Sequence, residues 1–296
     1  MTFSATDAAF EGFRMVRRHP LAVVFWTALY LMAFAAFFSA FGASLASILA
    51  STETLQGTEP TPADLEGLSQ TYLSLFALVA PLGLVLGAVL NAAVARAVVR
   101  PQDRSFGYLR LGMDELRVLA VTLVMAIIIG VGTMVLFTVV GICVGLAAAV
   151  NVGLGWLTGI VLGLGAVAAV VWIMVRLSLA VPITVAERRI SLFDSFGLTR
   201  GHSLSLLGMG VIAFIMSILV GMLMGVVALP LTMTTGGLEQ LSALDGSSNL
   251  DVLRAAGPAI AAFVVVNALV SALQLAVLYA PFSAAYLGLK GLPQQG

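Results

Sequence analysis

Two histidines and one cysteine are the only side chains of this chain that commonly serve both as catalytic groups and as soft metal ligands. His19 and His202 each precede a long apolar run without a cysteine or paired carboxylates around them, and Cys143 lies inside an apolar run. The sequence has no P-loop, no Gly-x-Ser-x-Gly turn and no His-Glu-x-x-His helix. We therefore expect no catalytic residue, no metal site and no cofactor.

One arginine, Arg176, interrupts an otherwise apolar segment shortly before Pro182. An unpaired charge inside a membrane helix costs about 2.5 kcal/mol or more, so the guanidinium is expected to have a partner. One candidate is Glu187, if Pro182 ends the helix and the chain then turns back toward the membrane surface; the other is a lipid phosphate. Snorkelling of the side chain toward the headgroups is the simpler alternative.

Three polar residues, Asn267, Ser271 and Gln274, follow one another at steps of four and three, which places them on one face of a helix. Amides facing lipid would lack hydrogen-bond partners, so this face is expected to point into the protein. The side chains could cross-link helices, at about 0.6 kcal/mol each, or they could line a substrate path. We expect these side chains to link helices through hydrogen bonds.

The composition places these residues in a membrane protein. The chain is 60% hydrophobic and 9% charged, with a mean hydropathy of +1.10, whereas soluble domains carry roughly 25% charged residues. This excludes a water-soluble domain. The 14 basic and 14 acidic residues balance, so the chain lacks the positive field that nucleic-acid binding needs. One cysteine excludes an internal disulfide framework.

Long stretches without charge predict six membrane-spanning helices, because about 20 helical residues cross a bilayer core. The longest stretch, 118–175, is divided by the turn-like residues 151–155. Runs such as 120–129 do not alternate as the strands of a β-barrel would. The expected fold is an all-α integral membrane protein, a single membrane domain over 1–296. The predicted spans are 20–47, 71–97, 118–149, 156–181, 206–229 and 259–287.

The positive charges predict the orientation. All of the 14 basic residues except Arg254 fall at one end of these spans, and the loop over 51–70 is acidic. Basic residues stay on the cytoplasmic side, so both termini are expected to be cytoplasmic. The first apolar run is too long for a cleavable signal and is expected to remain as an anchor. The preference for Arg over Lys and the abundance of Ala, Val and Gly indicate a GC-rich bacterial genome. The expected location is therefore a bacterial inner membrane.

Two junction segments align without gaps, which suggests an internal repeat. They are Phe10-Glu-Gly-Phe13-x-x-x-Arg17-x-His19 and Phe193-Asp-Ser-Phe196-x-x-x-Arg200-x-His202, and a weaker third segment surrounds Phe106. We expect three units of an amphipathic interfacial helix plus a transmembrane hairpin, at 1–97, 98–185 and 186–296. The alternative is that the similarity is accidental, since every multipass protein has amphipathic junctions.

The first junction segment predicts an in-plane membrane helix. Its charged residues share one helical face, and an apolar face lies opposite. The charged residues are Asp7, Glu11, Arg14 and Arg18, and the apolar ones are Ala9, Phe13 and Val16. In the third and fourth spans, glycines at 155, 159 and 163 and at 141 and 145 predict close packing of two helices.

A pattern within 172–201 resembles that of a known family. An arginine late in a span is followed by a proline, a glutamate and a Ser-x-x-Leu-Thr-x-Gly turn. The matching residues are Arg176, Pro182, Glu187, Ser195, Leu198, Thr199 and Gly201. The pattern resembles the membrane domain fused to some bacterial glycerophosphoryl diester phosphodiesterases and found alone in many multipass proteins. The catalytic part of the fused proteins needs several His and acidic ligands that are missing here, so the resemblance implies a membrane domain without hydrolysis.

The expected function is non-enzymatic. Basic residues at the membrane surface attract anionic lipid by about 1 kcal/mol each. We expect a basic cytoplasmic rim to engage anionic lipid headgroups or a protein partner. Its residues would be Arg176, Glu187, Arg200, His202, Arg17 and His19. The alternative is a small transporter or lipid translocase, with an integral-membrane enzyme third. Ligand and oligomeric state stay open.

Overall fold

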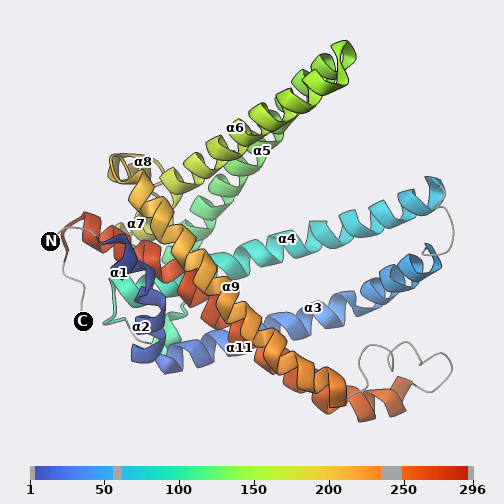
Figure 1. The fold of residues 1–296 in the computed structure, drawn as a ribbon. Helices are drawn as coiled ribbons and strands as arrows, with labels where there is room; N and C mark the ends of the chain where they lie inside the picture. The colour runs from blue at the N-terminus through green and yellow to red at the C-terminus, as the bar shows by residue number, and fades with distance from the viewer. Residues whose placement is uncertain (1–3, 56–61, 104, 235–248, 293–296) are drawn as a thin grey trace.

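Three pairs of long helices fan out from one end of the protein in the computed structural model (Figure 1). The structure describes residues 4–55, 62–103, 105–234 and 249–292, and this part of the chain is helical without strands. The first helix, α1, and the end of α11 lie where the pairs meet, which we call the base; the opposite ends of the pairs are the tips (Figure 1).

The long helices confirm the prediction of six spans. They pair in sequence order: α3 (Pro20–Leu55) with α4 (Pro62–Val99), α5 (Met113–Val150) with α6 (Val152–Leu177), and α9 (Ser203–Thr234) with α11 (Asn249–Leu289). Within the described residues, six helices are long and apolar enough to cross a membrane. The predicted division at Asn151 is also confirmed, because its side chain accepts a hydrogen bond from Gly153 N at 2.7 Å and caps α6.

The base contains the short elements of the fold. These are α1 (Ala5–Ala9), α2 (Glu11–Arg18), the 3₁₀ turn η1 (Ser105–Tyr108), α7 (Ala180–Glu187) and α8 (Asp194–Leu198). The centre of the base is the last part of α11, which packs against α2, α3, α4 and α9. Trp26, Leu90 and Ala276 belong to the main apolar cluster there and are fully buried. The base is therefore the packed core of the protein.

Toward the tips, most large apolar side chains are exposed. Examples on three of the long helices are Phe76, Met134, Leu146 and Trp156. In the most apolar stretch of α5 no residue is buried inside the protein. Exposed apolar side chains on a helix of this length are suited to contact with lipid acyl chains. The long helices are therefore packed by protein at the base and present apolar surface beyond it.

The end of the fourth span differs from the prediction. The span was expected to reach residue 181 and to end through Pro182, but α6 ends at Leu177. Pro182 lies in the first turn of α7, where a missing backbone N–H removes no helical hydrogen bond. The Ser178 hydroxyl donates to the Val175 carbonyl at 2.8 Å at the break. Proline thus starts the next helix instead of ending the span.

The N-terminal segment has the predicted charged face, and of its predicted apolar face Ala9 and Val16 pack inward but Phe13 does not. Arg14 pairs with Asp7 and Glu11, and Arg18 pairs with Glu11. Phe13, predicted on the apolar face, is 40% exposed, whereas Ala9 is buried as part of a small-residue face that packs on α9 and α11. A Cβ on Gly12 would lie 2.5 Å from the Val277 Cα, so α2 and α11 touch backbone to backbone. Small residues allow this approach, and phenylalanine does not.

The glycines predicted to bring α5 and α6 close together do so only near the tip of this helix pair. A Cβ on Gly155 would lie 2.9 Å from the Ala148 Cα, and one on Gly159 would make an ordinary contact with Val144. A Cβ on Gly163 would meet nothing within 4 Å. The predicted close packing therefore holds at the start of α6 and is wrong at Gly141, Gly145 and Gly163, where an added Cβ would meet open space.

Candidate functional site

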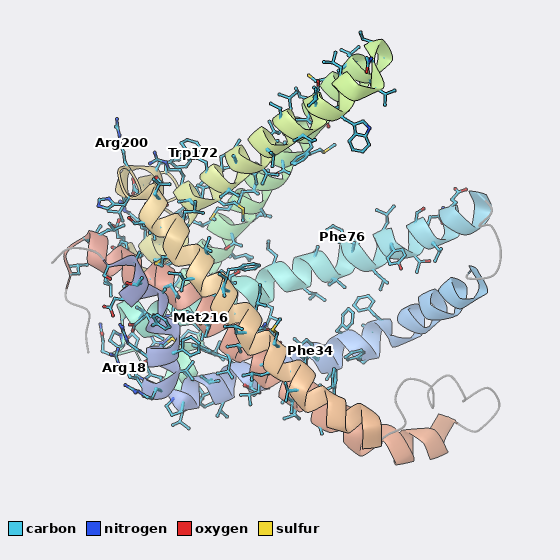
Figure 2. The ribbon with its side chains drawn as sticks, in the orientation of Figure 1. Arg18, Phe34, Phe76, Trp172, Arg200 and Met216 are labelled. Atoms are coloured by element: carbon cyan, nitrogen blue, oxygen red, sulfur yellow. The ribbon has the colours of Figure 1, made fainter. Side chains whose placement is uncertain are left out.

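The residues predicted for a basic rim lie in separate parts of the base. Arg176, Arg200 and His202 belong to a region that we call the α8 corner, formed by the end of α6 and by residues 194–202. Arg17 and His19 lie at the end of α2. Figure 2 shows Arg200 and Trp172 near one another, with Arg18 at the opposite side of the base. The residues predicted for the rim therefore fall into two separate groups at the base.

Arg176 is bound to α8. Its Nη1 donates to the Phe196 carbonyl at 3.1 Å and lies 3.5 Å from the Thr199 hydroxyl. The Ser195 hydroxyl donates back to the Arg176 carbonyl at 2.6 Å, and the guanidinium lies over the Trp172 ring at 5.2 Å. These contacts place a cation at the C-terminal end of α8, where the helix dipole favours positive charge. They also join the end of the fourth span to the turn that follows it.

One edge of the Arg176 guanidinium is unused. Its Nε is buried and has no hydrogen-bond partner, and Nη2 has none among the described residues. Nε and Nη2 form the side of the guanidinium that binds two oxygens of one carboxylate or phosphate. Buried polar groups without a partner are uncommon in folded proteins. Because Nε is covered by the protein, Nη2 is the nitrogen at which Arg176 can still meet an external oxyanion.

The predicted pair between Arg176 and Glu187 is wrong. Glu187 pairs instead with Arg189, at 2.7 Å, and with Lys290 at the end of α11. Arg189 also binds Asp194 at 2.6 Å. The Ser191 hydroxyl donates to Asp194 and, together with Arg189, holds the pKa of that carboxyl below its ordinary value. The folding of α11 onto α7 provides Glu187 with a closer cation than Arg176.

Three arginines of the base are exposed and have no carboxylate partner among the described residues: Arg17, Arg188 and Arg200. The other arginines whose side chains the structure describes, apart from Arg176, form ion pairs with Asp or Glu. These three side chains therefore carry positive charge that the protein itself does not neutralise. Their surroundings suit an external anion.

The two histidines occupy different surroundings. The His19 ring meets the Tyr108 ring edge-on, with 5.5 Å between centroids, whereas His202 is exposed. Over the described residues, no group of three or more His, Cys, Asp and Glu side chains could hold a metal ion. His19 and His202 occupy the same position in the two aligned segments, but their contacts differ.

A buried ion network at the base was missed by the sequence analysis. Arg96, 1% exposed, pairs with Glu115 and donates to the Tyr108 carbonyl. Arg100 pairs with Asp114 at 2.8 Å and donates to the Val185 carbonyl at 2.6 Å. The sequence does contain a sign of this network, because two arginines four residues apart precede two adjacent carboxylates in the first turn of α5. The arginines served only to predict the orientation of the chain in the membrane.

The loop between α4 and α5 has an unusual backbone conformation, which this network stabilises. Phe106 and Tyr108 have φ of 50° and 65°, in the left-handed region that non-glycine residues rarely adopt. The buried Trp26 indole donates to the Gly107 carbonyl at 2.9 Å. Contacts from α3 and α4 thus fix this loop, and its described charges, Arg100, Asp103 and Arg110, form ion pairs within the protein. We assign it a structural role.

The intramembrane polar face on α11 contacts the neighbouring helix at one residue. Gln274 Nε2 donates to the Ser217 carbonyl of α9 at 3.1 Å. A Cβ on Gly221 would lie 2.5 Å from the same nitrogen, so this glycine leaves space for the amide. The Ser271 hydroxyl donates to the Asn267 carbonyl within α11, at 2.7 Å. The face therefore provides one link between α9 and α11.

The α8 corner is the best candidate site, because it combines an unused guanidinium edge with an exposed arginine and an exposed tryptophan. Trp172 is 52% exposed, and tryptophan is enriched at the level of lipid headgroups. Such a corner can bind an oxyanion at a membrane surface. Comparisons with protein-family models, curated proteins and solved structures find no match for this chain.

Proposed function

We propose that this chain is a polytopic protein of a bacterial inner membrane that binds anionic lipid headgroups at a basic cytoplasmic rim and has no catalytic activity. The observation that carries the proposal is the set of exposed arginines without carboxylate partners at the base, namely Arg17, Arg188 and Arg200. At a membrane surface each such residue favours anionic lipid by about 1 kcal/mol. A protein partner on the cytoplasmic side is the alternative ligand.

Exposed aromatic side chains beside these arginines support an interfacial position. Phe10, Phe13 and Phe193 are exposed at the base. The rings of Phe10 and Phe13 and those of Phe193 and Phe196 both lie 6.4 Å apart, at similar tilts. This likeness supports a repeat of interfacial helix plus hairpin, and aromatic groups next to cations are typical of segments that lie in the membrane surface.

The resemblance to the phosphodiesterase-linked membrane domain enters as part of the proposal. Three residues of its pattern, Arg176, Ser195 and Thr199, contact one another around α8. This supports the interpretation of the pattern as one structural unit. We propose that the chain is a stand-alone domain of that kind, placed with both termini in the cytoplasm because basic residues cluster at the base.

Lipid preference tests the function. The protein is placed in nanodiscs of phosphatidylcholine and phosphatidylglycerol, and the lipids retained on release are counted by native mass spectrometry. Changing Arg17, Arg188 and Arg200 together to Gln should lower the preference for phosphatidylglycerol by up to about a hundredfold. Arg254→Gln, in the first turns of α11, is the control and should have no effect. A wild-type protein without any preference for phosphatidylglycerol contradicts the proposal.

A further inference from the structure

A shallow apolar groove runs along the α5–α6 pair directly above the α8 corner. Its lining residues are Ile128, Ile129, Gly132, Thr133 and Leu136 of α5 and Val170 and Ile173 of α6, and it is open along one side. The volume that it encloses is about 20 Å³, whereas pockets that enclose drug-sized ligands measure roughly 300–1,000 Å³. The lining of α5 extends from residue 128 to 136, about 12 Å of helix at 1.5 Å per residue. The groove therefore suits a narrow chain better than a compact molecule.

The groove and the cationic corner are continuous. Ile173, at the lower end of the groove, precedes Arg176 by three residues, so the two lie on neighbouring parts of one helix face. Ile129 and Ile173 also pack in the cluster that contains Phe196. The Phe196 carbonyl accepts the hydrogen bond from Arg176 Nη1. One helix pair thus presents an apolar groove that ends at a guanidinium with an unused edge.

We propose that this groove and the α8 corner bind one anionic phospholipid, with an acyl chain along the groove and the phosphate at Arg176 Nη2. Charge complementarity identifies the occupant, because the α8 corner has an unused guanidinium edge and the exposed Arg200, neither paired with a carboxylate among the described residues. Exposed Trp172 lies beside the guanidinium, at the depth expected for a headgroup. This inference deepens the proposed function and depends on it.

Two glycines of α5 provide a matched pair of variants. Gly132 lines the groove and Gly130 does not. Both are exposed, and a Cβ at either position would meet nothing within 4 Å. Leucine at Gly132 fills the groove without a clash, and leucine at Gly130 adds the same apolar surface next to it. Comparison of the two separates groove occupancy from any general effect of a larger side chain.

The experiment measures how much phosphatidylglycerol the released protein retains from mixed nanodiscs. Gly132→Leu should lower retention at least about tenfold relative to Gly130→Leu, at equal thermal unfolding midpoints. Arg176→Gln should lower it about tenfold as well, because hydrogen bonds to charged groups are among the stronger ones. If Arg176→Gln fails to fold, the two glycine variants still decide the result.

Other results would overturn the proposal in distinguishable ways. Equal retention by Gly132→Leu and Gly130→Leu, with a loss in the triple arginine variant at residues 17, 188 and 200, removes the groove site and leaves the proposed function intact. No preference for phosphatidylglycerol in the wild type removes both. If inorganic phosphate competes for retention equally in Gly132→Leu and Gly130→Leu, the site binds the free anion and the lipid assignment is wrong.

Discussion

At the scale of single residues, the most deeply buried ion pair in the described part of the chain joins Arg96 to Glu115, whose side chains are 1% and 6% exposed. Removal of one partner from such a pair leaves an uncompensated charge away from water. We expect Glu115→Gln to lower the free energy of unfolding by about 3 kcal/mol, measured by thermal or chemical unfolding in detergent.

The control for this prediction is a pair whose arginine is exposed. Arg18 pairs with Glu11 at 3.3 Å, the Arg18 side chain is 39% exposed, and Glu11 keeps Arg14 as a second partner. Pairs of this kind contribute about 0–1 kcal/mol, so Arg18→Gln should change stability little. Similar losses in both variants would show that burial does not distinguish the Arg96 network.

A second prediction at this scale concerns Gln274. Its amide donates to the Ser217 carbonyl and links α11 to α9, so Gln274→Leu should cost about 0.6 kcal/mol of stability. Ser271→Ala is the matched control, because the Ser271 hydroxyl bonds only within its own helix. Thermal unfolding midpoints of the two variants give the comparison. A Gln274→Leu protein as stable as the wild type would leave the substrate-path interpretation as the better one.

Residue types and local spacing predicted which side chains need partners but not which partners they have. Arg176 needed hydrogen-bond acceptors, and the acceptors are the Phe196 carbonyl and the Thr199 hydroxyl, 20 and 23 residues away. Glu187 pairs with Lys290, which is 103 residues away. Contacts of this kind depend on how the helices meet in space, which the spacing of residues along the chain does not encode.

At the scale of elements, the packing of α2 on α11 depends on Gly12. A Cβ there would lie 2.5 Å from the Val277 Cα and 2.7 Å from the Ala276 carbonyl oxygen, so Gly12→Ala must push the two helices apart. We expect a lower unfolding midpoint and faster tryptic cleavage at Arg17 and Arg18 as α2 leaves α11. Both measurements use the purified protein in detergent.

Gly208 in α9 is the matched control for Gly12. A Cβ at Gly208 would meet nothing within 4 Å. In a helix interior the change to alanine is then neutral or stabilising by about 0.5–1 kcal/mol. If Gly12→Ala is as stable and as resistant to trypsin as Gly208→Ala, α2 does not depend on this close contact.

The long helices were predictable and the short ones were less so, for a physical reason. The membrane requires about 20 consecutive apolar residues, which leaves a strong signal in the sequence. The break between α6 and α7 falls at 178–179, not at Pro182, because local hydrogen bonds at Ser178 end α6. Short helices such as α8 are held by contacts from elsewhere in the base, so their own residues specify them weakly.

At the scale of the whole molecule, the basic residues and the packed core lie at the same end. The basic residues with described side chains lie at the base, which also contains the packed core, while the tips carry exposed apolar side chains (Figures 1 and 2). An arrangement of this kind holds three helix pairs together at one membrane surface and leaves their outer parts for lipid. The orientation of the base is therefore the main feature of the whole protein to test.

Cysteine labelling tests the orientation, because Cys143 is the only cysteine in the chain. In a Cys143→Ala background, Ser69→Cys places a thiol toward the tips and Gln102→Cys places one at the base, and both positions are exposed. With a cytoplasmic base, an impermeant maleimide added to intact spheroplasts should label only the Ser69→Cys protein. Gln102→Cys should become labelled after the membrane is permeabilised. The reverse pattern would place the base outside the cell, and labelling of both proteins in intact spheroplasts would show that the helices do not separate the two compartments.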